Sequence, residues 1–227
     1  NVLLKQKNEP KGLIKLSCPP VMMEHQIRPL LNQFLKDHPQ VDVEMELTSR
    51  RVDVLHDDID LAIRTNFGVN EDSSIIVRDV IKTTHCLVVS PELLQGQTIE
   101  HVTQINDFPT IVLGTQKTNY HWHLHNLKHQ DEIKILLEPR IKSNDLAGVY
   151  YAVLDGLGIA DLPYLTVKED IEAGRLIHLL PDWCSNLGTV QLVYASRKGQ
   201  RLVMEKLIEH LIEGVRSYAP THEGYLT

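Results

Sequence analysis

The sequence has few of the residues that define several common classes of protein. It holds three cysteines, Cys18, Cys86 and Cys184, which are too widely spaced for a disulfide framework, and an odd number fits a reducing compartment. No run of apolar residues approaches the roughly 20 that a membrane-spanning helix needs. Basic residues are outnumbered, with 23 Lys and Arg against 30 Asp and Glu. The resulting net charge of -7 makes this chain by itself a poor binder of nucleic acid.

Sequence motifs for catalysis and for cofactor binding are absent as well. The chain has no Gly-x-Ser-x-Gly, no phosphate-binding Gly-x-x-x-x-Gly-Lys, no His-Glu-x-x-His and no Cys-x-x-Cys. Gly156 and Gly158 lie where a helix is expected to end and a strand to begin, which is the reverse of a dinucleotide-binding turn. We therefore expect a protein that is not an enzyme and that needs no cofactor.

What is present is a regular alternation of strand and helix patterns. The first 65 residues predict strands at 13–20, 41–47 and 60–65, a long helix at about 22–37 and a short one at 52–56. Pro29 should kink the long helix or lie in its first turns, because proline lacks a donor N–H. This order is typical of a parallel sheet with crossover helices.

The rest of the chain continues the same alternation. Strands are expected at 74–80 and 85–91 as an antiparallel pair, then at 110–114, near 121–125, within 133–144, at 158–163 and at 189–197. Helices are expected at 145–158, with Asn144 or Asp145 as cap and Gly156 as terminator, from 164 to a stop at Gly174, and at 201–215. The pattern predicts an α/β protein with two lobes of similar size.

Small polar residues follow three of the predicted strands, where open α/β sheets bind ligands. They are Ser17 and Cys18 at the end of the first strand, Thr65 and Asn66 at the end of the third, and Thr115 and Gln116 after the strand at 110–114. Ser17 could instead simply cap the following helix, and the residues alone favour that interpretation. Cys18 beside a helix N-terminus could hold a stabilised thiolate, although a buried, inert cysteine is commoner.

Residues 119–129 carry four histidines. His121, His123 and His125 alternate with Trp122 and Leu124, so they share one face of a strand. A metal site would need a third ligand, for which His129 is the nearby candidate. We expect no functional metal here, and interpret the histidines as a surface that could respond to pH.

Several segments together resemble one family, the effector-binding domain of LysR-type transcriptional regulators. The resemblance covers about residues 12–216 and rests on GLIKLSCPP, DLAIRT, DSS, SPELL, EPRIKSND, GLGIADLP, AGRLIHLLPDW and VQLVYASRK. It implies a fold like that of type 2 periplasmic-binding proteins, with two Rossmann-like lobes joined by two crossing strands. The lobes would be 12–90 with 188–227, and 91–187.

The resemblance also implies a small effector bound between the lobes. Carried over residue by residue, the effector-binding set would be Ser17, Cys18, Pro19, Arg64, Thr65, Asn66, Thr115, Asn144 and Asp161. Members of the family often have an apolar residue at the position of Asp161. A carboxylate there would disfavour a simple anionic effector unless it turns away or meets a cation.

Members of the family carry an N-terminal winged helix-turn-helix, which this chain lacks, so residues 1–11 resemble the end of its linker. DNA would then be bound only through that missing domain, by a cytoplasmic protein without membrane contact. The resemblance implies a homodimer, and a tetramer for the full-length protein, with helix 22–37 against helix 145–155 of the partner. Candidate interface residues are Met22, Ile27, Leu31, Val149 and Tyr150, for which packing in the chain's own core is an equally good interpretation.

A free-standing solute-binding protein of a transport system is the alternative function, because it would share the fold. The upstream reading frame distinguishes the two: a signal peptide there would exclude the regulator, and a helix-turn-helix would support it.

Overall fold

The computed structural model describes residues 10–69, 73–114, 120–195 and 202–218. The chain divides into two compact units. Unit 1 holds the described residues up to Lys82 and those from Gly188 onward, and unit 2 runs from Thr83 to Leu187. The first passage between the units therefore lies at 82/83, where the sequence had suggested 90/91.

Unit 1 is built on a mixed sheet. Its parallel part consists of β1 (Gly12–Cys18) between β2 (Val41–Leu47) and β3 (Leu61–Asn66). β12 (Leu187–Ala195) runs antiparallel beside β3, and β4 (Ile75–Val89) follows β12. The three parallel strands confirm the crossover arrangement predicted for the first 65 residues.

Helices cover the sheet of unit 1. The segment after β1 comprises α2 (Pro20–Met22), a π-helical turn (Met23–Ile27) and α3 (Arg28–Asp37). Pro29 lies in the first turn of α3, where its missing N–H leaves no helical hydrogen bond unmade. The wide turn immediately before it has the N–H of Arg28 bonded to the carbonyl of Met23, so the proline interrupts the helix as predicted.

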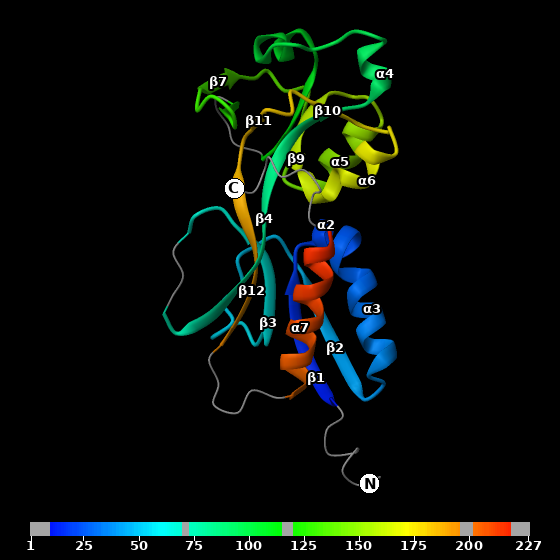
Figure 1. Ribbon diagram of the computed structural model, residues 1–227, viewed down its shortest axis with the longest axis vertical. Coiled ribbons are helices and arrows are strands. Elements are labelled where there is room, and N and C mark those ends of the chain that lie inside the picture. The colour runs from blue at the N-terminus through cyan, green and yellow to red at the C-terminus, as the bar shows by residue number, and fades with distance from the viewer. Residues whose placement is uncertain (1–9, 70–72, 115–119, 196–201, 219–227) are drawn as a thin grey trace. The chain divides into compact units, whose positions relative to one another are not determined.

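The last helix, α7 (Leu202–Ser217), packs on α3 (Figure 1). It buries an apolar stripe that includes Leu207 and Leu211, and the ring of His210 lies 2.8 Å from the carbonyl oxygen of Leu30. Leu30 also occupies the space beside Gly214, where a Cβ would come within 2.3 Å of its side chain. A residue with a Cβ at position 214 would therefore require the Leu30 side chain to move.

Unit 2 has a central sheet formed by the second half of β4 with β9 (Ile159–Pro163), β10 (Ile177–Leu179), β5 (Thr110–Leu113) and β8 (Ile141–Ser143). Both faces of β4 are buried there. Cys86 and Val88 pack in a cluster with α5 (Leu146–Leu154) and α6 (Tyr164–Glu172), whereas Leu87 and Val89 pack in a second cluster on the other face. The alternation follows from the two-residue period of a strand.

The second cluster is covered by a small three-stranded sheet, by α4 (Pro91–Leu94) and by a 3-10 helix (Val102–Asp107). The small sheet has the order β11 (Trp183–Cys184), β6 (His121–Asn126), β7 (Glu132–Leu136). Trp122 and Leu124 of β6 point into the cluster. Among the described residues, no helix has the length and apolar character needed to cross a membrane.

Two sequence predictions of local structure were wrong, and one was incomplete. The expected antiparallel pair 74–80 and 85–91 is one continuous strand, β4, because Lys82 to Thr84 continue the strand from one unit into the other. Residues 52–56 form turns and loop, not a helix. The segment 133–144 is two strands, β7 and β8, that belong to different sheets.

Candidate functional site

In unit 1 the predicted ligand-binding residues lie at the carboxyl ends of adjacent strands. Ser17 and Cys18 end β1, and Arg64, Thr65 and Asn66 end β3, the neighbouring parallel strand. Because parallel strands end at the same edge, the fold brings these two groups together. Ser17 does not cap the next helix, α2. The N-cap residue of α2 is Pro19, which makes no side-chain hydrogen bond.

The individual side chains differ in their availability to a ligand. Cys18 is fully buried, and burial raises the pKa of its thiol, so the thiolate suggested by the helix N-terminus is not favoured. Asn66 closes a turn, with its amide N–H donating to the carbonyl of Val69 and its oxygen accepting from the Val69 N–H, both at 2.8 Å. Arg64 and Thr65 are half-buried.

In unit 2, Asp161 belongs to a polar cluster that the sequence did not reveal. Its Oδ2 accepts a hydrogen bond of 2.6 Å from Ser185 Oγ and lies 3.3 Å from His85 Nδ1. Its side chain is 9% exposed, and Oδ1 has no hydrogen-bond partner among the described atoms. A hydroxyl and an imidazole therefore contact the carboxyl group that was expected to disfavour a simple anionic effector.

The other two predicted residues of unit 2 are less informative. Asn144 is exposed between β8 and α5, immediately before Asp145, which caps α5 by accepting from the N–H groups of Ala147 and Gly148. Thr115 lies outside the described residues. The effector roles of both residues stay predictions.

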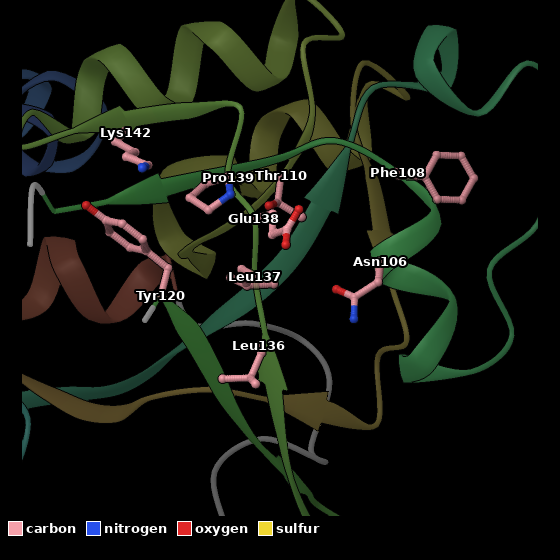
Figure 2. A pocket seen from close by; sticks show the side chains of 9 residues that line it. All are labelled: Asn106, Phe108, Thr110, Tyr120, Leu136, Leu137, Glu138, Pro139 and Lys142. Atoms are coloured by element: carbon pink, nitrogen blue, oxygen red, sulfur yellow. The ribbon is translucent and has the colours of Figure 1, made fainter. Parts of the chain in front are cut away.

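Unit 2 also contains a pocket of about 750 Å³, within the range of small-molecule sites (Figure 2). Its polar side chains come from Asn106, Thr110, Tyr120, Glu138 and Lys142, and the Lys142 ammonium lies 4.9 Å from the centre of the Tyr120 ring. Phe108, Leu136, Leu137 and Pro139 complete the lining. None of these residues was predicted as a ligand contact, because the pocket combines segments without a local motif.

The predicted dimer residues are mostly buried within the chain. Ile27, Leu31 and Val149 are at most 2% exposed, and Tyr150 packs with α6. Met22 keeps a half-exposed side chain. The four buried residues therefore pack in the chain's own core, which was the alternative to an interface role.

The histidine-rich strand was predicted correctly in its orientation. Trp122 and Leu124 are buried, so His121, His123 and His125 lie on the opposite face. The residue that joins His123 and His125 is Glu132 of β7, and not the suggested His129. The sequence contained the necessary signal, since a hairpin around residues 127–131 places Glu132 directly opposite His125.

The chain has two α/β units, and in each unit polar side chains lie at the ends of sheet strands. This arrangement is typical of a two-lobed ligand-binding domain. The family model described as "LysR substrate binding domain" matches residues 7–216. The chain therefore belongs to the LysR substrate-binding domain family.

Known proteins agree with this assignment. The chain is 28% identical over 210 residues to the HTH-type transcriptional regulator PtxR of Pseudomonas aeruginosa, covering 90% of the chain and 66% of PtxR. An HTH-type regulator of Haemophilus influenzae is 28% identical over 173 residues, which are 76% of the chain and 59% of that protein. The chain thus spans about three fifths to two thirds of the length of these relatives.

Solved structures have the same fold. The regulatory domain of AphB from Vibrio vulnificus is 25% identical, with a TM-score of 0.76 over 90% of the chain and 98% of that domain. CrgA of Neisseria meningitidis, a LysR-type transcriptional regulator, has a TM-score of 0.79 at 20% identity, covering 94% of the chain and 72% of CrgA. The predicted periplasmic-binding-protein-like α/β fold is confirmed.

Proposed function

We propose that the chain is the effector-sensing and dimerising part of a LysR-type transcriptional regulator, and that it acts by binding and not by catalysis. The observation that carries this proposal is the family match over residues 7–216, together with a regulatory-domain fold. The relatives described above are HTH-type regulators, which favours this function over a transport-related binding protein. DNA binding would belong to a helix-turn-helix outside this chain, in a cytoplasmic protein.

The proposed effector is a small polar molecule bound at the strand ends. In unit 1, Arg64 and Thr65 supply a guanidinium and a hydroxyl from half-buried side chains at the end of β3, and the neighbouring Ser17 at the end of β1 is buried, with 3% exposure. In unit 2, Asn144 is accessible, and the carboxyl group of Asp161 contacts Ser185 and His85. The guanidinium and hydroxyl groups at the strand ends of unit 1 fit a ligand that carries oxygen acceptors.

A thermal-shift screen of small carboxylates, aromatic acids and nucleobases tests this proposal. A binder at a hundredfold excess over its Kd should stabilise the domain by about 2.7 kcal/mol. Loss of one hydrogen bond in Thr65→Val should weaken the binder by about 1 kcal/mol, roughly fivefold, whereas the exposed control Thr103→Val should leave the affinity unchanged.

The variant Lys142→Met distinguishes the strand ends of unit 1 from the pocket of unit 2. If Lys142→Met abolishes binding and Thr65→Val has no effect, the effector occupies the pocket and our assignment to the strand ends is wrong. Absence of any binder in the three classes would count against the sensing role itself.

Dimerisation is tested by sedimentation equilibrium. Because Met22 is the predicted interface residue with a half-exposed side chain, Met22→Glu should weaken the dimer at least tenfold, which is about 1.4 kcal/mol. Leu136→Glu places the same charge at an exposed apolar residue of β7 and serves as the control. A monomeric wild-type chain at high concentration, or equal effects of both variants, would contradict the proposal.

A further inference from the structure

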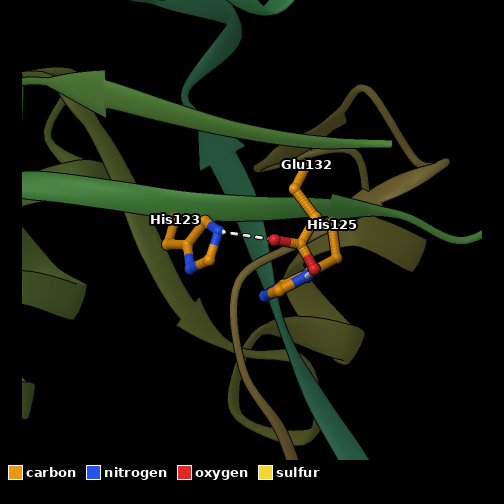
Figure 3. A group of neighbouring side chains, drawn as sticks. All are labelled: His123, His125 and Glu132. Carbon is orange, nitrogen blue, oxygen red and sulfur yellow. Dashed lines mark hydrogen bonds and ion pairs between the residues drawn. The ribbon is translucent and has the colours of Figure 1, made fainter. Parts of the chain in front are cut away.

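Three side chains that can bind a metal meet on the exposed face of the β6–β7 hairpin (Figure 3). His123 Nε2 lies 3.2 Å from one carboxylate oxygen of Glu132, and His125 Nδ1 lies 3.1 Å from the other. One ligand atom from each residue lies within 4.8 Å of the other two. Two imidazoles and one carboxylate therefore converge in a group that is not part of the strand-end site.

The fold fixes these positions through the opposite face of the hairpin. Trp122 pairs with Ile135 and Leu124 pairs with Ile133, and these residues pack in the core of unit 2. A shift of one residue in the register would turn this apolar set toward solvent, so the packing determines the register. With that register, His125 lies directly opposite Glu132, and His123 follows on the same face.

We propose that His123, His125 and Glu132 bind a divalent ion of the Zn²⁺ class. Ligand atoms about 2.1 Å from a tetrahedral zinc are separated from one another by about 3.4 Å. The imidazole nitrogens lie 3.2 and 3.1 Å from different oxygens of Glu132, and one ligand atom of each residue lies within 4.8 Å of the other two, so side-chain rotation must close the remaining gap. The two imidazoles, with side chains 52% and 37% exposed, have room to rotate toward each other. A water molecule would take the fourth position, as in zinc sites with three protein ligands.

The surrounding charges set limits on the ion. Glu132 supplies one negative charge, whereas Lys134, which pairs with His123 across the hairpin, adds a positive charge on a flexible and exposed side chain. Lys128 near the turn is neutralised by Asp182. Imidazole ligands favour Zn²⁺ and similar ions over Mg²⁺ and Ca²⁺, which prefer sites made of oxygen ligands.

A bound ion would cross-link β6 to β7, and its effect would extend to β11. His125 pairs with Glu132 on one side and with Cys184 of β11 on the other. The ion would therefore hold the hairpin at the point where all three strands of the small sheet lie side by side. We expect zinc to raise the melting temperature of the chain and to protect the β6–β7 amide groups from hydrogen exchange.

Calorimetric titration of the untagged, metal-free chain with ZnCl₂ tests the proposal. We expect one saturable zinc per chain, no displacement by excess MgCl₂, and an affinity at least tenfold lower in Glu132→Gln and in His123→Ala. His121→Ala on the same strand face and His129→Ala beside the hairpin are matched controls that should bind as the wild type does.

Because all these side chains are exposed or half-exposed, the variants should fold, which circular dichroism checks. The melting temperature is a second readout: zinc should raise it in the wild type and in His121→Ala, but not in His125→Ala. Absence of saturable binding, or unchanged affinity in Glu132→Gln, would overturn the assignment, and the trio would then be ion pairs only. Loss of binding in His129→Ala alone would overturn it as well.

Discussion

Replacement of Tyr150 by phenylalanine should measurably destabilise unit 2. The hydroxyl of Tyr150, on α5, donates a 2.7 Å hydrogen bond to Oδ2 of Asp170 on α6. Asp170 is 3% exposed, and its Oδ1 accepts a 2.6 Å bond from Arg175 Nε. Burial, followed by the contact with the carboxylate, raises the pKa of Tyr150, so its hydroxyl remains protonated and donates at physiological pH.

The size of the effect follows from these contacts. A hydrogen bond to a charged group contributes about 1.5–3 kcal/mol, and Tyr150→Phe should lower the free energy of unfolding by that amount. Asp170→Ala should cost more, about 3 kcal/mol, because it leaves the buried hydroxyl without an acceptor. Arg175→Ala should cost less than about 1 kcal/mol, since that side chain is 58% exposed and its ion pair is screened by solvent.

Urea denaturation followed by tryptophan fluorescence is the appropriate assay. Both tryptophans of the chain, Trp122 and Trp183, belong to unit 2, so the signal reports on that unit. Tyr151→Phe is the matched control, because Tyr151 is the next residue on the same helix and is 51% exposed. Equal losses in Tyr150→Phe and Tyr151→Phe, or a loss below about 0.5 kcal/mol in the former, would refute the reasoning.

Three further predictions concern reactivity, packing and pH. All three cysteines are buried and have raised thiol pKa values. Iodoacetamide should therefore modify them slowly in the folded chain and quickly in urea, and rapid labelling of the folded chain would contradict this. Gly158→Ala should lower the free energy of unfolding in urea by about 1–3 kcal/mol, because a Cβ there would lie 2.8 Å from the backbone carbonyl oxygen of Pro109. An unchanged unfolding midpoint would show that the backbone moves to make room. The hydrogen bond between His56 and Asp53 raises the pKa of His56 and lowers the pKa of Asp53. The ion pair therefore stabilises the fold fully between the usual pKa of an aspartate, about 3.9, and that of a histidine, about 6.5. This stabilisation is lost as the pH rises through the raised pKa of His56 or falls through the lowered pKa of Asp53. In an NMR titration, Asp53→Asn should therefore lower the midpoint of His56. Equal His56 midpoints in the wild type and the variant would exclude the coupling.

Much of the fold could be predicted because its local patterns are strong. β2 was predicted with its observed bounds, since apolar residues alternate through 41–47. The Asp145 cap and the left-handed Gly156 (φ +70°) at the end of α5 follow from well-known helix-end preferences. Pro29 marked the irregular turn before α3 because a proline ring removes the N–H that a helix interior needs and clashes with the preceding turn.

The errors lie where long-range contacts determine the structure. Lys82 to Thr84 separate two strand-like segments in the sequence, and in the fold β4 continues through them as the chain passes from unit 1 to unit 2. Asp161, Ser185 and His85 meet across separations of 24 and 76 residues, so no local periodicity relates them. Glu132 was missed although the sequence is sufficient to find it. Aligning the two strands of the hairpin across their turn would have placed Glu132 opposite His125.

The interruption of unit 1 by unit 2 has a consequence for synthesis on the ribosome. Residues 83–186 of unit 2 emerge before β12 and α7, which unit 1 needs to complete its sheet and cover α3. Domains generally fold as units during translation. The nascent chain should therefore finish its middle section first, and hold the apolar face of α3 uncovered until its last helix is made.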